Sequence, residues 1–448
     1  MPGASPADQR APVASERPHQ RGLRAAVVAF HHRNFTLFWL GALVSNIGTW
    51  MQNLTVPFAL LYVMNTSSVW VGIATISQFL PSVILGPIAG WLADRFERKR
   101  VLLISQLVQL LLALLLWGAW QTGLRSPTAF VGLVALSGAV FGVTAASWQA
   151  FVSELVPRED LLNAITLNSA QFNGSRAIGP ALAGLVLARF GPGSAFLANA
   201  FSFVAVIIAL LFVRLAATER AQHHEPLLEQ FVEGARYARR HTGITVAISV
   251  ITLVGLFALP VSQMATVVAK QVYKLSPGKF GVLTAAYGVG AIIGALLLGA
   301  LAGSVRRSRL VLLAVSGFAI SVALFGLAPS FVPGIAALVL CGISFIATGA
   351  SLNTSIQLLV GEHIRGRVLS LFIMAFTLAF PVGVLIQTTL ADRFGPRPVL
   401  VGAAALLGCV AVALAVRPAW LLALEEHTHR DGLLEPLAPV VSLPPAGI

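Results

Sequence analysis

The segment Gly90-Trp-Leu-Ala-Asp-Arg-Phe-Glu-Arg-Lys-Arg100 separates two long uncharged runs, residues 36–93 and 101–124. A hydrocarbon core about 30 Å thick needs roughly 20 apolar residues of helix to cross it, so the first run can hold two crossings and the second holds one. The charged segment is therefore predicted to be a short loop between membrane helices. Its basic residues indicate the cytoplasmic side, because positively charged loops resist translocation, and this assignment orients the whole chain.

The composition of the chain supports the same fold class. Of its 448 residues, 57% are hydrophobic and 10% are charged, with a mean hydropathy of +0.83, which excludes an ordinary soluble protein. We predict an all-α polytopic membrane protein that has the lipid bilayer as a partner. The net charge of +13 is attributed to loop topology rather than to a nucleic-acid partner. Cys341 and Cys409 show no disulfide or zinc spacing, so no metal site is expected.

Apolar windows predict twelve transmembrane helices in two pseudo-symmetric six-helix bundles. We place the bundles at residues 35–213 and 243–416, joined by a cytoplasmic linker at 214–242 and flanked by tails at 1–34 and 417–448. An even number of spans puts both termini on one side of the membrane. The predicted spans cover residues 35–62, 69–93, 101–122, 128–152, 162–188, 193–213, 243–268, 279–304, 310–328, 333–359, 367–390 and 398–416.

The distribution of basic residues places both termini in the cytoplasm. Of the 30 Lys and Arg residues, 22 fall in segments predicted to be cytoplasmic and 7 on the opposite side, as expected when basic loops stay inside. Residues 229–240 of the linker have an amphipathic pattern, which suits a tether in contact with the membrane surface or, alternatively, a regulatory segment. We expect a monomeric, multi-pass protein of a bacterial inner or plasma membrane.

Short repeats relate the two predicted bundles. Leu187-Ala-Arg-Phe-Gly-Pro192, after the fifth span, is echoed by Leu390-Ala-Asp-Arg-Phe-Gly-Pro396 after the eleventh. Two facing repeats are the transporter arrangement in which a substrate site lies near the midplane of the membrane. The expected partner is therefore a small-molecule substrate.

With these residues in place, the chain resembles the major facilitator superfamily of transporters. The superfamily signature Gly-x-x-x-Asp-Arg-x-Gly-Arg-Arg is matched except that Glu97 replaces the second glycine; the matching residues are Gly90, Asp94, Arg95, Arg98 and Lys99. The chain is also similar to the transmembrane secretion effector branch, which contains the enterobactin exporter and macrolide efflux proteins. The motifs that carry this likeness are Asn34-Phe35-x-Leu-Phe-Trp39, Ser45-Asn-Ile-Gly-Thr-Trp50, Leu155-Val-Pro-Arg-Glu-Asp160 and Asn168-Ser-Ala-Gln-Phe-Asn173.

The resemblance implies that the quoted segment forms part of a cytoplasmic gate. Asp94 would lie near Arg367 at the start of the eleventh span, where a helix N-terminus favours an acid. Gly90 would let the second and eleventh spans approach closely. Either Arg95 or Arg98 would pair with Glu154 at the end of the fourth span. The alternative, that these charges only signal topology, leaves Gly90 and Asp94 unexplained. The gating candidates are Gly90, Asp94, Arg95, Arg98, Glu154 and Arg367.

Polar residues inside the predicted spans are candidates for a substrate cavity. Arg176 lies about 15 residues into the fifth span, roughly 22 Å along the helix, and an arginine at that depth usually faces a partner or a watery cavity. The alternative for Arg176 is a structural bridge to backbone carbonyls, and uncharged polar residues can instead hold helices together. The substrate-binding candidates are Asn46, Trp50, Asn53, Asn168, Asn173, Arg176, Gln263 and Gln357.

The sequence contains no nucleotide-binding Walker loop and no dense catalytic cluster, so we expect neither an enzyme nor a cofactor. We predict a secondary active transporter that exports a siderophore-like or other amphipathic organic compound, and the resemblance implies proton antiport. No Asp, Glu or Lys lies well inside a predicted span, so coupling would run through Asp94 and Glu154 or through protons on the substrate. The alternatives are a multidrug or macrolide efflux pump and a non-transporting membrane sensor on the same fold.

Overall fold

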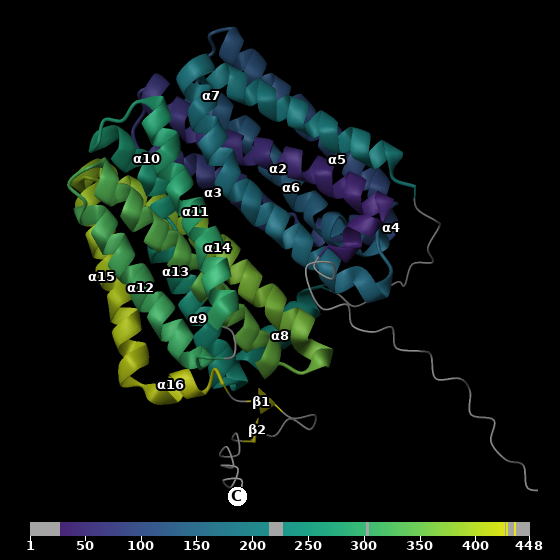
Figure 1. Ribbon diagram of the computed structural model, residues 1–448, viewed down its shortest axis with the longest axis vertical. Helices are drawn as coiled ribbons and strands as arrows, with labels where there is room; N and C mark the ends of the chain where they lie inside the picture. The colour runs from purple at the N-terminus through teal and green to yellow at the C-terminus, as the bar shows by residue number, and fades with distance from the viewer. Residues whose placement is uncertain (1–26, 215–226, 302–303, 426, 429–433, 436–448) are drawn as a thin grey trace, which may run out of the picture.

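The computed structural model describes residues 27–214, 227–301, 304–425, 427–428 and 434–435, and these residues form two helical halves (Figure 1). The N-terminal half consists of η1 (Val28–His31), α2 (Arg33–Phe58), the π-helical turn η2 (Ala59–Val63), α3 (Val69–Ile84), α4 (Gly86–Arg95), α5 (Arg98–Gln121), α6 (Pro127–Glu154), η3 (Arg158–Asp160) and α7 (Leu161–Phe212). The linker helix α8 (Leu227–Arg240) follows. The C-terminal half consists of α9 (Thr242–Phe257), α10 (Val261–Gln271), α11 (Pro277–Leu301), α12 (Arg307–Leu327), α13 (Phe331–Leu359), α14 (Glu362–Phe394), α15 (Pro396–Val416) and α16 (Pro418–Leu422).

The helices are consistent with the twelve predicted crossings, because each predicted span matches one helix or two helices in line. Within the described ranges, nine helical segments are long and apolar enough to cross a membrane. One of them, Arg158–Phe212, covers two predicted spans, and Gly191 breaks it with φ 74° and ψ 178°. A positive φ carries no steric penalty for glycine. The seventh predicted span is likewise divided, into α9 and α10, at Pro260, which cannot continue a helical hydrogen-bond ladder.

Each half is held together by its own helix pairs. In the N-terminal half α2 packs against α7, α3 against α6, and α5 against both α6 and α7. In the C-terminal half α11 packs against α13, α9 against α14, and α12 against both α13 and α15. The two halves meet along two lines, α3 with α14 and α7 with α11. This arrangement confirms the predicted all-α fold of two facing bundles.

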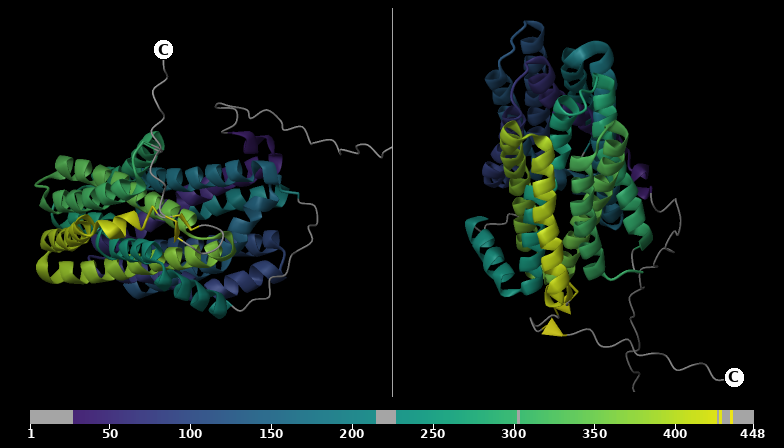
Figure 2. Two further views of the ribbon diagram at one scale, coloured as in Figure 1. Left: turned by 90° about the horizontal axis from the view of Figure 1, so that it is seen from below. Right: turned by 90° about the vertical axis from the view of Figure 1, so that its left-hand side faces the viewer.

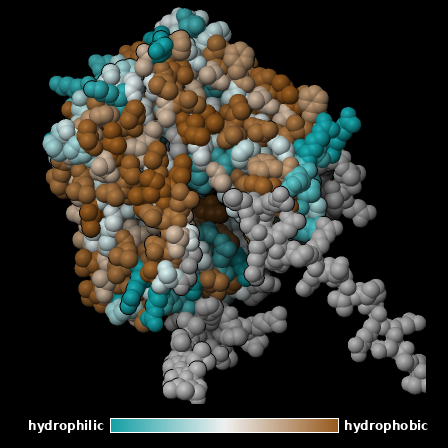
Figure 3. Space-filling model, viewed as in Figure 1, coloured by the Kyte–Doolittle hydropathy of each residue, from teal (hydrophilic) through white to brown (hydrophobic). Residues whose placement is uncertain are grey.

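The outer surface of the bundle is apolar. In Figure 2, α15 runs in yellow along the outside of the C-terminal half, where it exposes Leu406, Val412 and Val416. Figure 3 shows apolar residues spread over much of the visible face. Soluble monomers rarely expose apolar patches of this extent, whereas lipid requires them. The surface therefore fits a lipid bilayer.

Glycines bring the two halves into backbone contact. A methyl group added to Gly184 of α7 would clash with the backbone of Gly281 of α11, and the reverse substitution would clash equally. At the second line of contact, a methyl group on Gly72 of α3 would meet the backbone of Leu385 of α14. Small residues allow helices in a membrane to approach this closely.

Two elements outside the bundles refine the expectations from the sequence. The amphipathic stretch predicted at residues 229–240 is the helix α8, and Glu233 of α8 forms an ion pair with Arg367 of α14. Residues 215–226 of the predicted linker lie outside the described residues. In the predicted C-terminal tail, β1 (His427–Thr428) and β2 (Leu434–Glu435) pair antiparallel. The sequence pattern did not indicate this pair, because strands of two residues carry no periodic signal.

Candidate functional site

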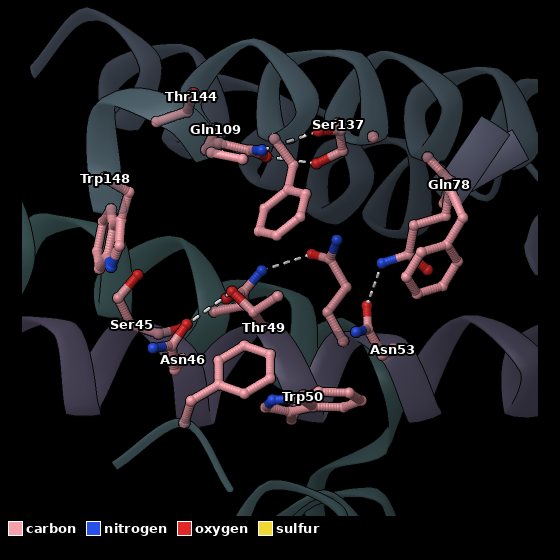
Figure 4. Close-up of a pocket in the computed structure, with 18 of the residues that line it drawn as sticks. Ser45, Asn46, Thr49, Trp50, Asn53, Gln78, Gln109, Ser137, Thr144 and Trp148 are labelled. Carbon is pink, nitrogen blue, oxygen red and sulfur yellow. Dashed lines mark hydrogen bonds between the residues drawn. The ribbon is translucent and has the colours of Figure 1, made fainter. Parts of the chain in front are cut away.

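A cavity of about 450 Å³ lies inside the N-terminal half. Its walls come from α2, α3, α5, α6 and α7, and the C-terminal half contributes only Gln263 of α10. The cavity is lined mainly by carboxamide and aromatic side chains, several of which point toward one another in Figure 4. Twelve of its lining residues are Asn or Gln, namely Asn46, Gln52, Asn53, Gln78, Gln106, Gln109, Gln149, Asn168, Gln171, Asn173, Asn199 and Gln263.

Pairs of carboxamides on facing helices fix one another in place. The Asn199 amide of α7 donates to Gln52 Oε1 of α2 at 2.7 Å. The Gln78 amide of α3 donates to Asn53 Oδ1 of α2 at 2.8 Å (Figure 4). Such bonds satisfy polar groups that would otherwise be costly to bury. The walls of the cavity are therefore largely pre-organised by contacts between helices.

Other hydrogen bonds complete the wall on α5 and α6. The Gln109 amide donates to the Ser137 carbonyl oxygen at 2.9 Å, and the Ser137 hydroxyl donates back to Gln109 Oε1. On α2, the Asn46 amide donates to Gln171 Oε1 at 3.3 Å. The donor and the acceptor of each bond belong to different helices. The bonds therefore fix the directions in which these side chains point into the cavity.

Two buried polar atoms of the cavity wall have no hydrogen-bond partner within the part of the chain that the structure describes. They are Gln106 Oε1, an acceptor, and Gln171 Nε2, a donor. Buried polar atoms are nearly always hydrogen-bonded, so each unsatisfied one asks for an explanation. A donor on a ligand or water would satisfy Gln106 Oε1, and an acceptor would satisfy Gln171 Nε2. These two side chains are therefore the lining residues best suited to bind polar groups.

Aromatic rings supply the apolar part of the wall. Trp50 and Phe172 meet edge to face with ring centroids 5.8 Å apart, and Phe79 meets Phe380 of the C-terminal half at 5.5 Å. Every lining residue is uncharged. An apolar cavity with a few oriented polar groups is the usual form of a small-molecule site. The combination suits an amphipathic molecule with several hydrogen-bonding groups.

A test separates the carboxamides that hold the fold from those available to a ligand. We expect Asn199→Leu to lower the free energy of unfolding by about 1–3 kcal/mol, because Gln52 then loses its buried donor. We expect Gln106→Leu to leave thermal stability unchanged or higher, because Oε1 has no protein partner to lose. Thermal unfolding of the purified variants measures both effects, and equal destabilisation by the two substitutions would contradict this division.

Arg176 lies beside the cavity rather than in its wall. Its guanidinium carbon is 5.2 Å from the ring centre of Trp50, 5.5 Å from that of Tyr287 and 4.7 Å from that of Phe345. Trp50 lines the cavity, whereas Tyr287 and Phe345 belong to α11 and α13 of the other half. Distances below about 6 Å are those of cation–π contacts. Arg176 therefore sits where the cavity meets the boundary between the halves.

The structure brings most of the predicted binding residues together. The residues at the cavity are Asn46, Trp50, Asn53, Asn168, Asn173 and Gln263. Gln357 is not among the lining residues, and its amide donates instead to Asn353 on the same helix. The residues on α3 and α5 were missed by sequence reasoning, although the three-residue spacing of Gln106 and Gln109 places both on one helix face. Their role as ligand contacts remains a prediction.

One end of the molecule is closed by hydrogen bonds between the halves, and we call it the closed end. The carboxylate of Asp392, at the end of α14, accepts from the backbone N–H groups of Ser68 at 2.7 Å and Val69 at 2.9 Å, where α3 begins. This is the geometry of a helix N-cap supplied by another helix. The Gln271 amide of α10 adds a bond to the Ser68 hydroxyl at 2.9 Å.

Lys270 adds a further bridge at the closed end. Its ammonium donates to the carbonyl oxygen of Leu61 and, at 2.8 Å, to Oδ1 of Asn65. Leu61 lies within η2, and Asn65 follows η2 by two residues. Three side chains of the C-terminal half, those of Lys270, Gln271 and Asp392, thus form hydrogen bonds with residues 61–69 of the N-terminal half. Sequence reasoning placed Asp392 only at a span end, because its partners are more than 300 residues away in the chain.

The opposite end, which we call the open end, carries the predicted gating residues. Arg98 donates to Glu154 at 2.6 Å, one of the two pairings expected from the sequence. Arg367, expected near Asp94, pairs with Glu233 of α8 in this conformation. The packing of Gly90 and the side chain of Asp94 lie outside what the structure describes. Figure 3 shows the molecule hollowed between the halves toward this end. The gating roles remain predictions.

Comparison with known proteins shows the family. A family model described as transmembrane secretion effector matches residues 25–437. The enterobactin exporter EntS of Escherichia coli O1:K1 is 27% identical to 75% of this chain and is covered over 80% of its own length. Macrolide efflux protein A of Streptococcus pyogenes is 24% identical, with 84% of this chain and 94% of that protein covered.

Solved structures share the fold. The nucleoside transporter NupG superposes with a TM-score of 0.68 at 13% identity over 86% of this chain and 98% of its own. A bacterial homologue of the iron transporter ferroportin, in an inward-facing state, superposes with a TM-score of 0.65 at 19% identity over 86% of this chain and 99% of its own. At these identities the likeness concerns the fold alone.

Proposed function

Because the chain belongs to the transmembrane secretion effector family of the major facilitator superfamily, we propose that it exports a siderophore-like or other amphipathic organic compound by alternating access. The observation that carries this proposal is the pre-organised cavity of carboxamides and rings, which lies beside the boundary between two halves that are closed at one end. Alternating access is the relative rocking of two such halves around a central site. The relatives named for export of enterobactin and of macrolides support the direction of transport.

The orientation in the membrane follows from the basic residues. The open end carries Arg95, Arg98, Lys99 and Arg100, and positive loops remain in the cytoplasm. In that orientation both termini are cytoplasmic, and the closed end faces the outside of a bacterial inner membrane. An exporter loads from the cytoplasm in this conformation. We propose that one chain suffices, because it contains both halves of the pathway.

The energy source that we propose is the proton gradient. In the described part of the chain, carboxylates lie at the ends of membrane helices rather than in their middles, as Glu154 and Asp392 do. Coupling would therefore use a carboxylate at a gate, such as Glu154 beside Arg98, or a proton carried by the substrate. The protonation step would then take place at the open end of the N-terminal half rather than at the midplane.

Flux measured in inverted membrane vesicles tests the function. We expect vesicles that contain the protein to accumulate a catecholate siderophore fragment when a proton gradient is imposed, at about ten times the rate of empty vesicles or more. A protonophore should abolish the difference. Accumulation of erythromycin instead would favour the macrolide efflux alternative. A ligand that binds without any flux would identify a membrane sensor and would contradict the export function.

A further inference from the structure

We propose that Arg176 and Tyr287 form a subsite for an anionic group of the substrate, so that the transporter selects anionic amphipathic compounds over cationic ones. This inference rests on the proposed export function and deepens it by naming the substrate class. The side chains around Arg176 and the composition of the adjoining cavity wall both support this substrate class.

The guanidinium of Arg176 keeps its hydrogen-bonding capacity free for a ligand. No described residue accepts a hydrogen bond from it or forms an ion pair with it; its close neighbours are the rings of Trp50, Tyr287 and Phe345. A guanidinium has five N–H donors. The faces of aromatic rings attract its positive charge but do not occupy these donors as an oxygen acceptor would. A cation placed in a membrane protein without a carboxylate usually faces a functional partner.

Tyr287 supplies a second, independent observation. Its side chain is only 4% exposed, and its hydroxyl has no hydrogen-bond partner among the residues that the structure describes. A buried hydroxyl without a partner is unfavourable unless a ligand or water completes it. The ring centre of Tyr287 is 5.5 Å from the guanidinium carbon of Arg176, so we assign both groups to one subsite in which an anion would accept hydrogen bonds from each. A carboxylate is an acceptor of this kind, and arginine binds carboxylates in a bidentate manner.

The adjoining cavity favours the same class. Its wall offers neutral amides and aromatic rings, and none of the lining residues that the structure describes is Asp or Glu. A cationic group would find no counter-charge among the described lining residues. It would also lie near the like charge of Arg176, whose guanidinium carbon is 5.2 Å from the ring centre of the lining residue Trp50. A site that leaves the charge of a cationic compound without a partner binds that compound weakly, which gives selectivity for anionic compounds. Gln106 and Gln171 then bind the neutral polar part of the molecule through their unpartnered atoms.

Three probes that share one dihydroxybenzoyl core test the charge preference. They are dihydroxybenzoylserine, its uncharged carboxamide, and the amine N-(2-aminoethyl)dihydroxybenzamide, each titrated onto the full chain in lipid nanodiscs at pH 7. We expect the acid to bind most tightly and the amine most weakly. Arg176→Gln should weaken binding of the acid about ten- to one-hundred-fold and change binding of the carboxamide less than about threefold. Arg176→Lys should recover part of the loss, and Tyr287→Phe should weaken the acid about three- to tenfold.

A matched control is available at the surface. Arg125 lies 3.7 Å from the ring centre of Trp120, outside the cavity, so Arg125→Gln should leave all three affinities unchanged. Equal weakening of the acid and the carboxamide by Arg176→Gln would show a merely structural arginine and would overturn the subsite. If the wild type carries erythromycin in vesicles but binds none of the three probes, the export function stands and the anionic class is wrong. If nothing is carried, the export function itself fails.

Discussion

Replacing Gly281 with Val is expected to slow transport about 5- to 160-fold while the protein still folds and inserts. The side chain would project into the backbone of Gly184 on the facing helix α7, and backbone atoms cannot rotate away as a flexible side chain does. Overpacking of this kind costs about 1–3 kcal/mol, which corresponds to a roughly 5- to 160-fold shift away from the closed conformation. A transporter in which the contact between α7 and α11 cannot form cannot complete its transport cycle.

The measurement for Gly281→Val is flux in vesicles, together with the amount of folded protein in the membrane. Gly299→Val is the matched control, because Gly299 lies on the same helix α11 and has open space around it. We expect Gly299→Val to transport at nearly the rate of the wild type. If Gly281→Val also transports normally, the contact between α7 and α11 does not have to close, and the proposed cycle is wrong.

Replacing Asp392 with Ala is expected to shift the molecule toward a conformation in which the closed end is open. The substitution removes both hydrogen bonds to the N-terminus of α3. Loss of an N-cap costs about 0.5–2 kcal/mol, which corresponds to a roughly 2- to 30-fold change in the ratio of the two conformations. The effect is smaller than that of Gly281→Val because Lys270 and Gln271 still bridge the halves.

Distances between spin labels at the closed end measure this shift. Suitable sites are Leu124 after α5 and Val332 near the start of α13, both exposed, with Cys341 and Cys409 replaced by Ser. We expect Asp392→Ala to raise the population with the longer distance. Arg393→Ala removes the neighbouring charge, for which the structure describes no bond, and should leave the distances unchanged. A similar shift in both variants would point to a general effect of charge instead of a cap.

The fold could be predicted from the sequence because its signals are local. A run of apolar residues bounded by charges indicates a membrane helix whatever its neighbours are, and the segment Gly90–Arg100 supplies both a boundary and an orientation. The branch motifs were equally local, and the family match confirmed them. The same reasoning found the face of α2 that carries Asn46, Trp50 and Asn53, since spacings of four and three residues over two helix turns bring them to one face.

The rest depends on contacts between distant helices. The sequence shows that Asp392 ends a span, but its partners Ser68 and Val69 become visible only when α3 meets α14. Arg176 was recognised as unusual by its depth, yet nothing in its own segment indicates that rings from α11 and α13 surround it. Gln357 was predicted to share a face of its helix with Asn353, and the hydrogen bond between the two side chains shows that its amide is used there.

Arg367 has a partner that the motif around Gly90 does not indicate. It was expected beside Asp94, whose side chain lies outside the described residues, and the structure shows its ion pair with Glu233 of α8. The helix α8 belongs to the connector between the halves, far in the sequence from the motif around Gly90, so its packing on α14 could not be predicted from that motif. The ion pair between Arg367 and Glu233 lies at the open end. An outward-facing conformation would either keep this ion pair or replace it with another contact.

The most direct test of alternating access is to measure distances at both ends of the same molecule. One label pair, Leu124 and Val332, reports the closed end, and a second pair, Leu162 on α7 and Leu301 on α11, reports the open end. With a compound that the vesicles accumulate, we expect the first distance to lengthen and the second to shorten in the same molecules. If either end moves while the other stays fixed, or if neither responds to a transported compound, the two halves do not rock around the cavity and the account is contradicted.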